Sequence, residues 1–128
     1  MSEAFVTASV SDASLSTAPD GSTVRPLCIL PGVASFAHFQ LAVGQVSTAV
    51  SHRTVQEIWY VLAGEGVMWR HQNDREELTP LTQGTCLTIP LGTSFQFRAG
   101  PAGLEVVAVT VPPWPDDPDE ARPEACRW

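Results

Sequence analysis

In the middle of the chain, the side chains best suited to acid–base chemistry are His52 and Glu57. Residues two apart in a strand point to one face, so His52 shares a face with Val50, and Glu57 shares one with Trp59. An imidazole and a carboxylate that meet in an apolar interior can share a proton, and the surroundings then tune both pKa values. These two residues are therefore a candidate catalytic acid–base pair.

The elements that would hold this pair are short strands. Turn signals such as Pro31–Gly32, Asn73–Asp74 and Gly100–Pro101 punctuate the sequence, and no long amphipathic helix is predicted. Regularly spaced short strands are typical of a sandwich or a closed barrel. The predicted β segments are Val24 to Leu30, Ala34 to Val43, Glu57 to Leu62, Gly66 to Trp69, Thr85 to Ile89, Ser94 to Arg98 and Leu104 to Val111.

The stretch from Gly44 to Gly64 resembles the first motif of the cupin family, which runs glycine, five residues, His, one residue, His, four residues, Glu, six residues, glycine. The register fits without a gap. Val50 stands at the first His position, His52 at the second, and Glu57 at the position of the acid.

A second stretch resembles the second cupin motif. Gly84, Pro90 and Gly92 match its glycine and proline positions, whereas Phe95 replaces the His and Ala99 replaces the Asn. The resemblance implies an all-β fold, a double-stranded β-helix or jelly-roll barrel in a single domain.

We expect three parts in the chain: an N-terminal arm over residues 1–21, a barrel over 22–112, and a proline-rich acidic tail over 113–128. The tail holds Trp114 and Trp128, two side chains that are costly to leave in water. We expect one of them to pack on the barrel or on a neighbouring subunit.

Metal-using cupins hold a divalent ion with three His and one Glu, a site that suits Fe, Mn, Ni or Zn. Only His52 and Glu57 remain at the matching positions, with His38 as a candidate extra ligand if it faces the interior. The resemblance therefore implies a reduced ligand set. We predict no cofactor, with a divalent transition metal as the alternative.

The predicted pocket combines a mainly aromatic interior with a few polar groups, which is typical of small-molecule sites. It favours a planar or largely hydrophobic ligand. Arg53, Arg70 and Arg98 are candidates for a charge at its rim. The predicted substrate-binding residues are Val50, Trp59, Phe95, Phe97, Gln40 and Trp69.

Three classes of function compete. The first is a metal-independent isomerase, epimerase or cyclase in which His52 and Glu57 transfer protons on a small carbonyl-containing metabolite. Metal-free sugar epimerases related to cupins use a barrel His in this way, and only His52 is carried over from them. The second class is a metal-dependent cupin oxygenase or isomerase, and the third is a non-catalytic small-molecule-binding cupin. The sequence favours the first class.

The composition argues against nucleic acid and membranes as binding partners. The net charge of −7 opposes binding to nucleic acid and to anionic membranes, and no run of 18 apolar residues is present. The N-terminus lacks the pattern of a secretory signal, so we expect a cytoplasmic protein. The family resemblance implies a homodimer, with the N-terminal arm as the exchanged segment.

Overall fold

The computed structural model describes residues 4–128, and this part of the chain is built almost entirely from strands. One short 3₁₀ turn, Val10–Asp12, precedes them. The strands are β1 (Ser16–Thr17), β2 (Thr23–Leu30), β3 (Ala34–Leu41), β4 (Val50–His52), β5 (Gln56–Gln72), β6 (Arg75–Thr82), β7 (Cys86–Ile89), β8 (Ser94–Val111) and β9 (Ala121–Pro123).

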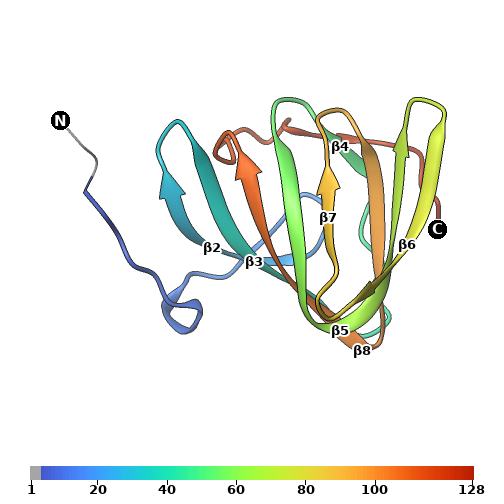
Figure 1. Cartoon of the computed structure of the whole chain (residues 1–128), viewed down its shortest axis with the longest axis horizontal. Coiled ribbons are helices and arrows are strands. Elements are labelled where there is room, and N and C mark those ends of the chain that lie inside the picture. Colours follow the sequence, from blue (N-terminus) through green and yellow to red (C-terminus); the bar gives the residue numbers. More distant parts are fainter. Residues whose placement is uncertain (1–3) are drawn as a thin grey trace.

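All strand pairs are antiparallel, and they form one sheet that curls around a common interior (Figure 1). One path through the sheet runs β1-β2-β3-β8-β4-β9, and β5 pairs with β6, β7 and β8. The long strands β5 and β8 pair with each other along most of their lengths, so they connect the other strands of the barrel. The prediction of an all-β jelly-roll barrel is confirmed.

Several boundaries differ from those expected. The turns at Pro31–Gly32 and Asn73–Asp74 connect strands as predicted, but Gly100–Pro101 lies inside β8 and not in a turn. β8 therefore joins two predicted segments, as β5 does. Strand β6 was not predicted, because Arg75–Thr82 is polar and contains a proline. Pro80 is tolerated there because β6 pairs with β5 alone.

The core lies in the interior of the barrel. In residues 56–61 of β5 and throughout β7 every second residue is buried, as expected where one face of a sheet is covered. Trp59 packs edge to face on Phe97, with ring centroids 4.9 Å apart. The buried cluster consists of Leu41, Val50, Trp59, Val61, Met68, Leu81, Leu87, Ile89, Phe95, Phe97, Ala99, Leu104, Val106 and Ala108.

The tail returns to the barrel. Its strand β9 pairs with β4, and the expectation that a tail tryptophan packs on the barrel is confirmed twice. The Trp114 ring lies 5.1 Å from that of His52, and the Arg98 guanidinium lies 4.4 Å above the ring of Trp128. Residues 4–15, by contrast, extend away from the strands in Figure 1, and Phe5 is 98% exposed. None of the helical segments described is long and apolar enough to cross a membrane.

Candidate functional site

His52 and Glu57 lie side by side because the chain reverses between them. His52 ends β4, and Glu57 is the second residue of β5. The turn that joins them is held by Glu120 of the tail, whose backbone carbonyl accepts the amide of Arg53 at 3.0 Å and whose carboxylate accepts the amide of Thr54 at 2.8 Å. The tail therefore fixes the angle at which the two strands present the pair.

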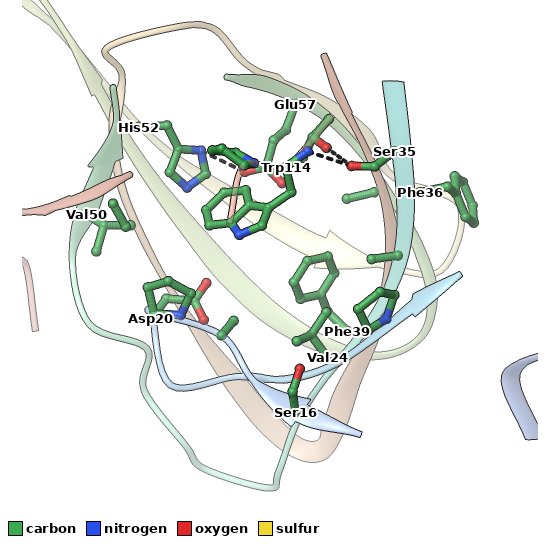
Figure 2. A pocket seen from close by; sticks show the side chains of 18 of the residues that line it. Ser16, Asp20, Val24, Ser35, Phe36, Phe39, Val50, His52, Glu57 and Trp114 are labelled. Carbon is green, nitrogen blue, oxygen red and sulfur yellow. Dashed lines mark hydrogen bonds and ion pairs between the residues drawn. The ribbon is translucent and has the colours of Figure 1, made fainter. Parts of the chain in front are cut away.

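The pair is close and buried. His52 Nδ1 lies 3.2 Å from Glu57 Oε2, and both side chains are more than nine-tenths buried. The contact is not aligned as a hydrogen bond, so Nδ1 has no well-directed partner. Glu57 Oε1 accepts a long hydrogen bond of 3.4 Å from Trp59 Nε1. Figure 2 shows His52 and Glu57 next to each other at the edge of the pocket.

Burial shifts both groups toward their neutral forms. Loss of water lowers the pKa of His52 to about 4, and the negative charge of Glu120 opposes this shift. Burial raises the pKa of Glu57 to about 8, the negative charge of Asp20 adds to the rise, and the Trp59 hydrogen bond works against it. At neutral pH the pair therefore consists of a neutral imidazole and a mainly protonated carboxyl.

The pocket beside this pair has a volume of about 320 Å³. Its interior is aromatic, with Phe39 stacked on Trp59 at a centroid distance of 6.1 Å. Segments from both ends of the chain complete it, because residues 16–20 and 114–116 line it together with strands of the barrel. The site is thus a mainly apolar pocket that contains a few polar side chains.

One of these polar groups, Asp20, was not predicted. It lies in the loop between β1 and β2, where Ser22 donates to its Oδ1 from the backbone at 2.9 Å and from the hydroxyl at 2.6 Å. Burial raises the pKa of Asp20, and the hydrogen bonds from Ser22 act in the opposite direction. Sequence reasoning missed it because Asp20 falls in a Ser- and Thr-rich segment with no motif.

The tail adds a second unpredicted part. The Trp114 amide donates to Ser35 Oγ at 2.9 Å, and this bond places the indole against His52. The Ser35 hydroxyl is also in contact with that of Thr110, the residue that pairs with Glu57 across β5 and β8. Figure 2 shows Trp114 lying across the pocket between Ser35 and His52.

The predicted substrate-binding residues separate into three groups. Val50 and Trp59 line the pocket. Phe95 and Phe97 lie in the core behind it, where Phe95 meets the His52 ring edge-on at 5.3 Å. Gln40 and Trp69 are outside the pocket: Gln40 accepts from Arg25 at 2.8 Å, and Trp69 donates to Glu76 at 2.8 Å.

The candidate extra ligand His38 is also away from the pair. Its neighbours in β3, Ala37 and Phe39, line the pocket, so the alternation of the strand turns His38 to the other face. There His38 Nε2 lies 3.3 Å from Glu105 Oε1. Within residues 4–128, no group of three or more His, Cys, Asp or Glu side chains could hold a metal ion.

No protein-family model matches this chain, and no curated protein matches it in sequence. Solved structures do match. KdgF from Halomonas is 18% identical with a TM-score of 0.75, over 89% of this chain and 98% of that one. Pac13 from Streptomyces, a nucleoside dehydratase, is 15% identical with a TM-score of 0.75, over 94% of this chain and 92% of that one. A Pac13 variant solved with uridine matches with the same TM-score.

The third match is to part of a larger chain. The capsular polysaccharide assembling protein CapF from Staphylococcus aureus is 13% identical with a TM-score of 0.74, over 89% of this chain but 34% of that one. At such low identities the likeness shows the fold. KdgF, Pac13 and CapF are cupin-fold proteins, and the chain described here accordingly has the cupin fold, a jelly-roll β-barrel. Its pocket is lined by strands β2, β3, β4, β5 and β8 and by the two terminal segments.

Proposed function

We propose that this protein is a metal-independent enzyme of the isomerase, epimerase or cyclase type that transfers protons on a small carbonyl-containing metabolite. The observation that carries the proposal is the 3.2 Å contact between His52 Nδ1 and Glu57 Oε2 at the edge of a 320 Å³ pocket. A paired imidazole and carboxyl with pKa values shifted by burial is typical of general acid–base sites.

The proposed step begins with an ionised Glu57 that accepts a hydrogen bond from the Nδ1–H group of a neutral His52. Nε2 then carries a free electron pair and removes a proton from the carbon next to the substrate carbonyl. The electrons of the broken C–H bond move onto the carbonyl oxygen, and the Glu57 carboxylate stabilises the imidazolium that forms. Return of the proton to another carbon, or to the other face of the same carbon, completes isomerisation or epimerisation.

A resident metal of the cupin type does not fit the donors at this site. His52 and Glu57 are two potential ligands, Val50 and Phe95 provide none, and His38 lies on the other face of β3. We derive no step through a metal. Elemental analysis of untagged protein checks this part of the proposal, which a stoichiometric transition metal would overturn.

The structural neighbours support a small-molecule substrate. Pac13 is a nucleoside dehydratase solved with uridine, and its chain is covered almost completely by this one. Elimination of water from a β-hydroxy carbonyl compound also starts with removal of a proton next to the carbonyl. The His52–Glu57 pair could therefore serve that reaction as well.

The test is hydrogen–deuterium exchange at the carbon next to the carbonyl, followed by NMR in D2O over a panel of small aldehydes and ketones. We expect His52→Ala and Glu57→Gln each to slow exchange by about 10²- to 10⁴-fold. The matched control is His71→Ala, because His71 stacks on Trp69 away from the pocket. Exchange should also rise with pH up to about 8, where Glu57 ionises, and Glu57→Gln should remove that rise.

Exchange that His52→Ala leaves at the wild-type rate would contradict the proposal. Ligand binding that survives His52→Ala, with no exchange in the wild-type protein on any substrate that binds, would favour a non-catalytic binding protein instead.

A further inference from the structure

The pocket carries acidic groups and no basic counterpart. Its titratable lining residues are Asp20, His52, Glu57 and Asp116, and no arginine is among the residues that line it. The chain has seven Lys and Arg residues in total, all of which the structure describes. The rim charges predicted from the sequence do not line the pocket: Arg70 pairs with Glu77 at 2.7 Å, and Arg98 covers Trp128. Arg53 follows His52 in the turn after β4, but it is exposed and is not among the lining residues.

A charge that enters such a site has to be paired, because an unpaired ion loses its hydration on burial without compensation. A phosphate or carboxylate group would find no permanent cation here. His52 is the one lining group that could become positive, and burial keeps it neutral at neutral pH, with a pKa of about 4. The other titratable groups of the lining are the carboxyls of Asp20, Glu57 and Asp116, which become negative when they ionise and can never supply a positive charge.

We infer that the pocket accepts uncharged small molecules and rejects phosphorylated or carboxylated ones. This inference deepens the proposed function and rests on it for the assumption that the pocket is the substrate site. Its geometric basis is the arrangement of Asp20 and Asp116 on the two terminal segments, with Glu57 on β5, around a cavity that is otherwise apolar and aromatic. In the view of Figure 2, Asp20 lies across the pocket from Glu57.

Asp20 is the residue that we assign to recognition of the neutral ligand. Both Ser22 hydrogen bonds go to Oδ1, which leaves Oδ2 for a hydroxyl, amide or carbonyl group of a ligand. A protonated carboxyl can donate as well as accept, so Asp20 can bind either kind of neutral partner. The same carboxyl offers nothing to an anion once it ionises.

The test is a panel of matched pairs of planar ligands, each an amide and the corresponding carboxylate, beginning with indole-3-acetamide and indole-3-acetate. Binding is measured by calorimetry at pH 7, and NMR shifts of the Trp59 and Trp114 indole N–H groups place each ligand. We expect each carboxylate to bind at least about tenfold more weakly than its amide. Equal affinities, or no binding by any member, would overturn the inference.

A second experiment reverses a charge at the rim of the pocket. Asp116→Lys, at an exposed lining position, should improve carboxylate binding relative to amide binding by about twofold to fivefold. The matched control is Asp119→Lys, an exposed residue of the same tail that does not line the pocket. An equal gain from both variants would show a general charge effect and contradict the inference.

The two proposals fail in different ways. Neutral ligands that bind without deuterium exchange would contradict the acid–base enzyme and leave the selection against anions intact. Rapid exchange on a carboxylate-bearing substrate would support the acid–base enzyme and contradict the selection against anions.

Discussion

Glu57 and His52 impose opposite pH dependences on the fold. The pKa of Glu57 is about 8 in the folded chain against an ordinary 4.5, so the folded chain binds this proton more tightly than the unfolded chain does. Stability therefore falls as the pH rises between these values. The pKa of His52 is about 4 against an ordinary 6.5, so its contribution to stability rises with pH between 4 and 6.5.

These opposite slopes lead to the first prediction. Below pH 6.5 the two effects oppose each other. Between pH 6.5 and 8 the His52 effect has ended, whereas the Glu57 effect continues and the raised pKa of Asp20 acts in the same direction, so the free energy of unfolding should decrease over that window. Glu57→Gln cannot ionise at this position, so its stability should fall less steeply there than that of the wild type. Urea unfolding at a series of pH values measures this. Asp119→Asn, which removes an exposed carboxylate, should follow the wild-type curve; a Glu57→Gln curve parallel to wild type would refute the prediction.

At the scale of single residues, the sequence located the pair but not its surroundings. Strand alternation and motif spacing predicted that His52 and Glu57 lie among apolar residues, and the structure brings them within 3.2 Å. The sequence predicted that a tail tryptophan packs on the barrel, but not that Asp20 and Trp114 line the pocket, because both reach it from segments that are far from the pair in sequence and have no periodicity. Gln40 and Trp69 lie outside because the face a strand turns inward depends on its pairing, and bulges change it.

The pairing of β5 with β8 depends on a close approach of two backbones. Gly64 has a φ of 82°, and a Cβ built on it would lie 2.2 Å from the backbone oxygen of Gly103. Here β5 also shifts register between Gly64 and Gly66. A side chain at Gly64 therefore conflicts with both the local conformation and the neighbouring strand.

We predict that Gly64→Ala destabilises the fold by about 3 kcal/mol or more, since positive φ alone costs roughly 1 kcal/mol and the clash adds to it. Gly84→Ala separates the two effects, because Gly84 also has a positive φ, of 90°, but open space around it. That variant should lose only about 1 kcal/mol. Equal losses in thermal or urea unfolding would show that the close approach to Gly103 is unimportant.

The attachment of the tail can be tested at Glu120. This buried carboxylate accepts the amide and the hydroxyl of Thr54. Burial alone would raise the pKa of Glu120, but the hydrogen bonds from Thr54 and from the backbone of Arg53 and Val55 outweigh it, and the net shift is downward. We predict that Glu120→Ala costs about 2 kcal/mol, because the amide and the hydroxyl of Thr54 both lose their charged acceptor.

A second readout distinguishes this role from simple packing. The charge of Glu120 raises the pKa of His52, so Glu120→Ala should lower that pKa further, as NMR titration of the imidazole would show. The control is Glu124→Ala, which removes an exposed acceptor of the Ser51 hydroxyl and should have a smaller effect on both measurements. An unchanged His52 titration would contradict the assigned coupling.

At the scale of elements, the barrel was largely predictable and its terminal strands were not. The glycines of both motifs occupy positive-φ turns or bulges and Pro90 follows the end of β7, as their types require. Strand β9 could not be recognised, because three residues after a proline-rich stretch acquire their pairing only from β4. Tertiary contact, and not local preference, decides such short strands.

For the whole molecule, the homodimer stays a prediction, and the N-terminal segment suggests how to test it. Residues 4–15 extend from the barrel with apolar side chains in water: Phe5 is 98% exposed and Val6 64%. A second copy could cover them. We predict that the protein is a dimer by analytical ultracentrifugation and that removal of residues 1–15 yields a monomer with a folded barrel. A monomer at full length, or a dimer after truncation, would contradict this role.

The division of the tryptophans between the pocket and the outside has an optical consequence. The chain has four tryptophans, and Trp59 and Trp114 line the pocket. Trp69 and Trp128 hold fixed contacts elsewhere, with Glu76 and Arg98. Intrinsic fluorescence therefore contains a part that responds to pocket occupancy and a part that serves as an internal reference. Replacing the two outer indoles with phenylalanine would leave emission that reports the site alone, so ligands could be screened without any label.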